Sequence, residues 1–181
     1  MTPYPYSVES YRVPRSDEMP SKVLHATLPL RLHANWTELM HSAEQAIGRC
    51  RWSYGYTPSM IKDRFYFLAF MSPLPDTQEI VGMASCFLVE YHQVIQGIVS
   101  SVFVAPAHQR KHIGLALLEE IDVILRHPGR VGYNRGGTMG THSLQTFVPA
   151  TNYPAQQLFV RGGYTLSARG EIHLMHRSLR R

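Results

Sequence analysis

Hydrophobic residues alternate with polar ones, or run continuously, in several segments of the chain. Runs of this kind that are rich in β-branched and aromatic residues predict strands. The predicted strands are Ser7–Val13, Arg64–Met71, Glu79–Glu90, Gly97–Val104, Leu144–Val148 and a hairpin over Tyr164–Leu179 around Gly170. Met19–Leu32 fits either a strand or a loop. Because the second, third and fourth runs are too close together for crossover helices, we expect an antiparallel meander there.

Apolar side chains spaced three and four residues apart predict three helices. The first begins at Asn35, which with Glu38 fits a capping box. The second follows Val104 and ends before Pro128, and the third covers Pro154–Arg161. The apolar faces are formed by Trp36, Leu39, Met40, Ala43 and Ile47 in the first helix, and by Ile113, Leu117, Ile121 and Ile124 in the second.

The order of these elements is strand, helix, three strands, helix, strand, helix and hairpin. The helix between the strand ending at Val104 and the one beginning at Leu144 has the length of a crossover between parallel strands. We therefore expect an α/β (α+β) fold with a mixed, mostly antiparallel central sheet and helices on both faces. A length of 181 residues fits a single domain, residues 1–181.

Composition and charge argue against a secreted or membrane-spanning protein and favour a protein that binds an anion. Met1–Arg15 lacks the apolar core of a secretory signal, and no run approaches the roughly 20 apolar residues of a membrane span. With only two cysteines, Cys50 and Cys86, we expect reduced thiols and a cytoplasmic protein. The net charge of +5 favours an anionic partner. Because the basic residues are mostly scattered, nucleic-acid binding is the weaker of the hypotheses that this charge allows.

Candidate chemistry begins at a predicted corner between strand and helix, in Val102–Leu118. The first turn of a helix leaves backbone N–H groups without internal partners and carries partial positive charge, which suits a diphosphate. Arg110 and Lys111 add positive charge, and Gly114 lets a phosphate or a backbone approach closely. The alternative is an ordinary corner whose basic residues are solvated.

A second pattern lies in Asn152–Tyr164. By itself, Asn152 is an ordinary helix cap ahead of Pro154, and Gly162 with Gly163 is an ordinary helix stop. The position of this pattern about 40 residues after the first, with a helix and a strand between them, is what makes the pair informative.

Together the two segments resemble the GNAT family of N-acetyltransferases. The first is similar to its Gln/Arg-x-x-Gly-x-Gly/Ala loop: Gln109 and Gly114 match, and His112 stands where the family usually has glycine. The second is similar to Asn-x-x-Ala-x-x-Leu-Tyr-x-x-x-Gly-Phe at every spacing, with Phe159 at the tyrosine position. The resemblance covers Ile80–Tyr164 well and the first 60 residues only in element order.

The resemblance implies that acetyl-CoA binds where the parallel strands ending at Val104 and near Phe147 splay apart. It implies cofactor binding by Phe103, Val104, Ala105, Gln109, Arg110, Lys111, His112, Ile113, Gly114, Leu115, Ala116, Asn152, Ala155 and Phe159. The implied activity is direct transfer of the acetyl group to a primary amine of a small molecule or a protein. A homodimer is an expectation from the family alone.

Catalytic residues are less clear, because Phe159 has no proton to give to the departing thiolate. Tyr153, Tyr133 and Tyr164 are substitutes for the family's tyrosine, although each also fits a structural role. Candidates that could act as a base or orient a water are Ser100, Glu90 and His92. The alternative function is a non-catalytic, regulatory acyl-CoA-binding module. His173 and His176 lie three apart in a predicted strand, so they point to opposite faces and do not support a metal site.

Overall fold

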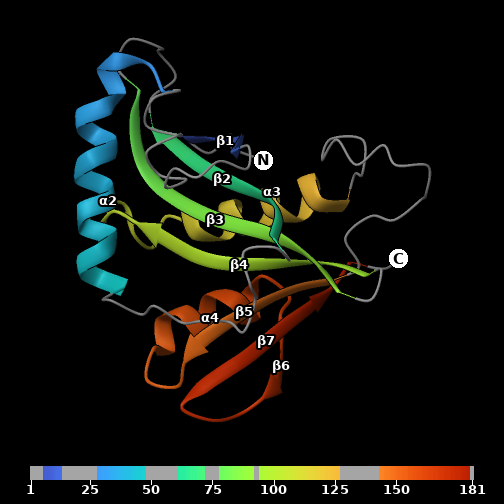
Figure 1. The fold of residues 1–181 in the computed structure, drawn as a ribbon. Helices are drawn as coiled ribbons and strands as arrows, with labels where there is room; N and C mark the ends of the chain where they lie inside the picture. The colour runs from blue at the N-terminus through green and yellow to red at the C-terminus, as the bar shows by residue number, and fades with distance from the viewer. Residues whose placement is uncertain are drawn as a thin grey trace, which may run out of the picture.

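The computed structural model describes residues 6–13, 28–47, 61–71, 78–91, 94–126 and 143–179. Seven strands form one sheet in the order β1-β2-β3-β4-β5-β7-β6 (Figure 1). They are β1 (Tyr6–Val13), β2 (Ile61–Met71), β3 (Glu79–Tyr91), β4 (Val94–Val104), β5 (Ser143–Pro149), β6 (Thr165–Ala168) and β7 (Ile172–Ser178). Neighbouring strands are antiparallel except β4 and β5, which run parallel. The predicted mixed sheet with one parallel pair is confirmed.

Helices cover both faces of the sheet (Figure 1). α2 (His33–Ile47) packs on one face, while α3 (Ile113–Arg126) and α4 (Tyr153–Arg161) pack on the other. Two short 3-10 turns, η1 (Leu30–Leu32) and η4 (Pro106–His108), precede α2 and α3. Within the described part of the chain, no helix is long and apolar enough to span a bilayer.

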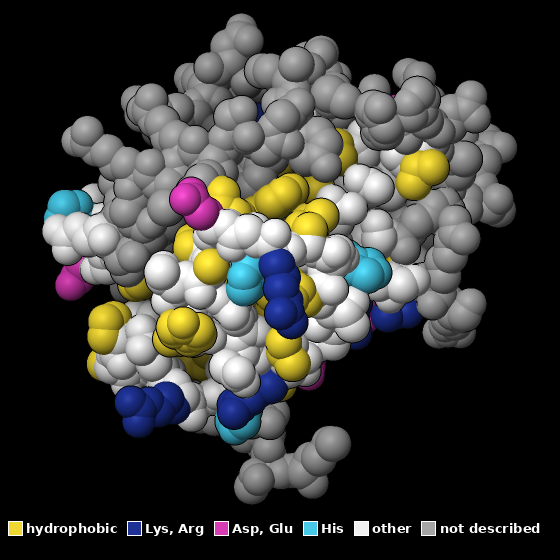
Figure 2. Space-filling view, turned by 90° about the horizontal axis from the view of Figure 1, so that it is seen from below, with side chains coloured by type: hydrophobic (Ala, Val, Ile, Leu, Met, Phe, Trp, Pro, Cys, Tyr) yellow, Lys and Arg dark blue, Asp and Glu magenta, His cyan; other side chains and the backbone are white. Residues whose placement is uncertain are grey.

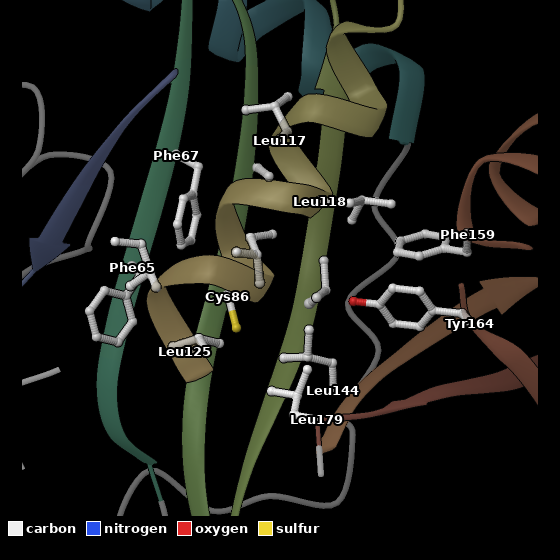
Figure 3. Close-up of a cluster of buried hydrophobic side chains, with 14 of the residues drawn as sticks. Phe65, Phe67, Cys86, Leu117, Leu118, Leu125, Leu144, Phe159, Tyr164 and Leu179 are labelled. Atoms are coloured by element: carbon white, nitrogen blue, oxygen red, sulfur yellow. The ribbon is translucent and has the colours of Figure 1, made fainter. Parts of the chain in front are cut away.

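Most of the apolar side chains predicted to face the sheet are buried: Trp36, Leu39 and Ala43 in α2, and Ile113, Leu117, Ile121 and Ile124 in α3. Leu117 and Ile121 of α3 lie in the largest hydrophobic cluster, which also holds Cys86 and Phe159 (Figure 3). Trp36 of α2 packs with residues of β2 and β3 in a second cluster on the opposite face. Burial of these two apolar stripes is the main force that holds the helices to the sheet.

The start of α2 differs from the sequence prediction. The helix begins at His33, directly after η1, so Asn35 lies inside its first turn rather than at its cap. The Asn35 side chain instead pairs with the backbone of Ile80: it donates to the carbonyl at 3.3 Å and accepts from the amide at 2.5 Å. The capping prediction was wrong because this partner is 45 residues away in sequence. Of Met19–Leu32, the described part is Leu28–Leu32, which contains the 3-10 turn rather than a strand.

The ends of α4 follow the sequence prediction. The Asn152 side chain accepts a hydrogen bond from the Ala155 amide at 3.2 Å and so caps the helix. At the other end, Gly163 has a φ of 80°, a conformation that glycine adopts without steric cost. Both signals are local, so they do not depend on the rest of the fold.

Candidate functional site

The parallel strands β4 and β5 stay together for only part of their length. Their register runs from Gln96 with Ser143 to Val99 with Thr146, and both strands continue beyond that last pair without a further partner between them. At the last pair, the Thr146 hydroxyl donates to the Val99 carbonyl at 3.1 Å. Strands that separate in this way leave a gap bordered by main-chain groups that the sheet does not use.

A cavity of about 910 Å³ occupies this gap. Its lining comes from Ser100–Val104 of β4, Thr146–Pro149 of β5, the loop and first turn of α3, and the cavity-facing side of α4. That volume lies at the upper end of the range for small-molecule and cofactor sites. Figure 2 shows the molecule from the side that carries α4, β6 and β7, with Lys, Arg and His side chains spread among hydrophobic ones.

One end of the cavity is the loop that leads into α3. Arg110 and His112 both have a φ of 61°, the left-handed region in which a non-glycine residue costs about 1–2 kcal/mol. His112 thus adopts the conformation that a glycine would take without strain. The Gln109 side chain donates to the Val104 carbonyl at 3.1 Å and ties the loop to the end of β4. Ile113, Gly114 and Leu115, the first residues of α3, line the cavity, and the first amides of a helix have no partner within the helix.

Gly114 lies where α3 packs closely against α4. A Cβ atom at this position would lie 3.2 Å from both Cδ atoms of Leu158 and 3.8 Å from a Cγ atom of Val104. The glycine therefore serves helix packing as well as the opening of the cavity. A large side chain here would displace Leu158 or enter the cavity.

The residues around this end fit a diphosphate-bearing ligand. Arg110 and Arg161 line the cavity and provide cations beside the helix start. His108 also lines it, and its Nδ1 atom is buried without a hydrogen-bond partner among the described residues. No acidic side chain contributes to the lining that the described residues form. A polyanion would therefore meet positive charge and amide donors there.

The other end of the cavity carries a cluster of three serines. Ser85 pairs with Ser101 while Cys86 pairs with Val99, so Ser100 is the extra residue of a β-bulge in β4. The Ser85 Oγ atom lies 2.7 Å from the Oγ atom of Ser100 and 2.5 Å from that of Ser101. Ser100 also donates to the Ser85 carbonyl at 3.2 Å. Ser100 and Ser101 line the cavity, and Ser85 supports them from the neighbouring strand.

Comparison of the sequence with known protein families identifies the family to which the chain belongs. The family described as the acetyltransferase (GNAT) domain matches residues 62–166, more than half of the chain. The chain belongs to the GNAT acetyltransferase family. Within the described residues, this match covers the separating strands, the loop before α3 and the whole of α4. A search of curated proteins by sequence found no match.

Solved structures of GNAT proteins share the fold over nearly the whole chain. A Klebsiella pneumoniae protein assigned as an acyl-CoA N-acyltransferase superimposes with a TM-score of 0.57 at 15% identity, over 96% of this chain and 97% of that one. The ribosomal-protein-S18-alanine N-acetyltransferase of Escherichia coli gives a TM-score of 0.53 at 15% identity, over 96% and 94%. Arabidopsis thaliana Naa50 in complex with the bisubstrate analogue CoA-Ac-MVNAL gives 0.52 at 12% identity, over 96% and 99%. At these identities the similarity establishes the fold.

Most of the residues that the GNAT motifs select lie around the cavity. The predicted cofactor residues that line it are Phe103, Val104, Gln109, Arg110, His112, Ile113, Gly114, Leu115, Asn152, Ala155 and Phe159. Ala105, Lys111 and Ala116 lie in the same segments but outside the lining. The tertiary structure thus brings the two sequence motifs to one cavity.

The three catalytic candidates lie apart from one another. Ser100 lines the cavity at the point where β4 and β5 separate. Glu90 pairs with Ile95, five residues from Ser100 along β4, which is about 17 Å at the rise of a strand. The Tyr153 side chain is 70% exposed and lies outside the lining. The structure therefore does not bring Glu90 or Tyr153 next to Ser100.

At the position where the family's motif has a tyrosine, this chain has Phe159, which packs against Tyr164. Phe159 is buried and meets the Tyr164 ring edge-on, with 5.0 Å between the ring centroids (Figure 3). Burial, followed by the nearby Cys86 thiol, raises the pKa of Tyr164 well above its ordinary value. The Tyr164 hydroxyl is buried without a partner among the described residues, and this residue is outside the cavity lining. Burial likewise raises the pKa of Cys86, although a backbone hydrogen bond from Ile98 opposes the shift.

Several lining residues were not selected from the sequence. They are His108, Ser101, Val102, Thr146, Phe147, Val148, Pro149, Pro154, Gln157, Leu158 and Arg161. Thr146 and Phe147 could have been found as the residues that follow the predicted splay point. Ser85 and Ser101 gave no signal, because their contact depends on the register between two strands and on the bulge at Ser100. Tyr133 and His92 lie outside the described residues.

Proposed function

We propose that this GNAT protein transfers the acetyl group of acetyl-CoA to a primary amine of a small molecule or a protein by direct attack. One observation carries the proposal: the start of α3 and the gap between β4 and β5 line the same cavity. When bound, acetyl-CoA supplies an activated acetyl thioester. A linear ligand with its diphosphate at Ile113–Leu115 would extend along β4 toward Ser100.

In this proposal the protein contributes binding, orientation and proton handling. The amides at the start of α3, with Arg110 and Arg161, bind the diphosphate. Main-chain groups over Phe103–Ala105 bind the arm, and a backbone N–H of β4 polarises the thioester carbonyl as the amine attacks. Ser100 orients a water molecule that accepts the proton of the amine, with Ser85 and Ser101 fixing the direction of its hydroxyl.

The proposal is tested by CoA release over a panel of small-molecule and peptide amines. Gly114→Glu is the control, because a carboxylate at the helix start repels the diphosphate. We expect the wild type to release CoA faster than Gly114→Glu with at least one amine. Equal, slow release by both proteins with every amine would contradict an enzymatic role.

A second function, a non-catalytic acyl-CoA-binding module, is favoured by a specific observation. Phe159 occupies the position of the family's tyrosine, and the buried Tyr164 beside it does not line the cavity. A thermal shift separates binding from turnover, since a ligand at 100 times its dissociation constant adds about 2.7 kcal/mol of stability. Stabilisation by acetyl-CoA without CoA release in the panel would favour the binding module. No stabilisation at millimolar acetyl-CoA would contradict both functions.

A further inference from the structure

The closed end of the cavity has one aromatic wall. Beyond the last register pair, Val99 with Thr146, the next residues are Ser100 on β4 and Phe147 on β5, and both line the cavity. This end is four residues along β4 from Val104, or about 13 Å from the end of the strand where the diphosphate site begins. The diphosphate and the acyl group of an acyl-CoA lie at opposite ends of the pantetheine arm. Under the proposed function, the acyl group therefore falls between Ser100 and Phe147.

The Phe147 ring is held in place by a small buried cluster. It packs against Phe87, Val89 and Ile98, which are between 0% and 8% exposed. These residues alternate along β3 and β4 with those that pack against α3, so the cluster lies on the face of the sheet that carries α2. The Phe147 side chain is itself partly buried, and the buried residues that it contacts are close-packed, so movement of the ring toward them would disturb the cluster.

The wall opposite Phe147 is equally restrained. Ser100 and Ser101 are both hydrogen-bonded to Ser85, and the bulge fixes their position in β4. Behind them, the Thr146 hydroxyl joins β5 to β4 at Val99 and closes the gap. The space for the acyl group is thus bounded by a packed ring on one side and by tied hydroxyls on the other.

We propose that Phe147 determines the acyl specificity of this site, limiting it to acetyl and excluding propionyl, butyryl and longer chains. This inference rests on the proposed function, because it needs an acyl-CoA bound in the cavity. Each added methylene would press on a ring that is backed by this buried cluster. One methylene in an apolar pocket typically discriminates by about 10- to 200-fold.

The test measures dissociation constants by calorimetry for free CoA, acetyl-CoA, propionyl-CoA and butyryl-CoA, with no acceptor present. We expect the wild type to bind acetyl-CoA at least about tenfold more tightly than butyryl-CoA. Phe147→Ala should bring this ratio to about one or invert it, while the affinity for free CoA stays within about twofold. Phe147→Leu, a milder change, provides the same comparison should the alanine variant not fold.

Phe87→Leu is the matched control. It removes the same aromatic volume from the same cluster, but Phe87 does not line the cavity. We expect it to leave the acetyl-to-butyryl ratio at the wild-type value. The inference is overturned if the wild type shows no preference, if the Phe147 variants keep the wild-type ratio, or if Phe87→Leu changes it equally. Those results leave the proposed function intact. A wild type that binds none of the four ligands would contradict both the inference about Phe147 and the proposed function.

Discussion

The Thr146 hydroxyl is hydrogen-bonded to the Val99 carbonyl, 3.1 Å away, at the last pair of residues that the two parallel strands share. Thr146 is only 3% exposed, so this contact is shielded from water. The bond lies where β4 and β5 begin to separate. It therefore sets both the start of the cavity and the relative position of its two walls.

Thr146→Val should loosen this junction. The substitution keeps the shape of the side chain but leaves the buried Val99 carbonyl without this donor, which costs about 1–3 kcal/mol of unfolding free energy. We expect a lower melting temperature and a several-fold weaker affinity for acetyl-CoA. Thr165→Val is the control, because Thr165 is also hydrogen-bonded but lies on β6, outside the cavity lining. Equal loss of acetyl-CoA affinity in both variants would show that the junction has no special effect.

Two substitutions of Gly114 should distinguish the effect of added side-chain volume on acetyl-CoA affinity from the effect of added negative charge. Gly114→Ala presses on the flexible end of Leu158 and should weaken acetyl-CoA binding only slightly. Gly114→Glu adds a negative charge at the helix start and should weaken binding by about 100-fold, or about 2.7 kcal/mol. Titration calorimetry at low and high salt checks the distinction, because only the electrostatic part is screened. Similar affinities for the two variants would argue against a diphosphate at this helix start.

Removing a hydroxyl from the serine cluster should slow the reaction without weakening cofactor binding. For Ser100→Ala we expect kcat to fall about tenfold, the effect of one hydrogen bond of about 1.4 kcal/mol in the transition state. The dissociation constant for acetyl-CoA should stay within about twofold of the wild type. Ser167→Ala, on β6, should leave kcat unchanged. An unchanged kcat for Ser100→Ala would remove this serine from the proposed mechanism.

Tyr164→Phe should leave the reaction intact and change stability in a pH-dependent way. Removal of a buried hydroxyl that has no partner among the described residues should be neutral or stabilising by up to about 1 kcal/mol. Because the pKa of Tyr164 is raised in the folded state, the folded protein favours the neutral form. Its contribution is present at neutral pH and is lost as the pH rises above about 10, where an unfolded tyrosine ionises.

Denaturant titrations at pH 7 and pH 10.5 check this prediction. The wild type should lose more stability than Tyr164→Phe between the two values, while kcat at pH 7 should agree within about twofold. A large fall in kcat at pH 7 would instead identify Tyr164 as a proton donor in the reaction.

Local signals in the sequence predicted local structure correctly. The Asn152 cap and the Gly163 stop bound α4 as expected, because a cap and a left-handed glycine act within a few residues. The same type of signal at Asn35 was misleading. Its side chain bonds to the backbone of Ile80, and that contact exists only once α2 packs against β3.

The candidate site shows the same division between local and distant effects. The motifs at Gln109–Gly114 and Asn152–Tyr164 span about half of the residues that line the cavity. Glu90, in contrast, was selected because it follows a predicted strand, and the register with Ile95 places it far from Ser100. The pairing of β3 with β4 begins at Tyr91 with Val94, whereas the sequence prediction ended one strand at Glu90 and began the next at Gly97, so it could not fix that register.

The sequence by itself therefore determined the order of the elements, the family and the position of the loop before α3, because hydrophobic period, caps and glycines act over neighbouring residues. Only the tertiary structure decided where β4 and β5 part, which serines meet, and that Phe147 and Ser100 line the same cavity. These relationships join residues far apart in the chain. Packing and strand register fix them, and neither is encoded in any single segment.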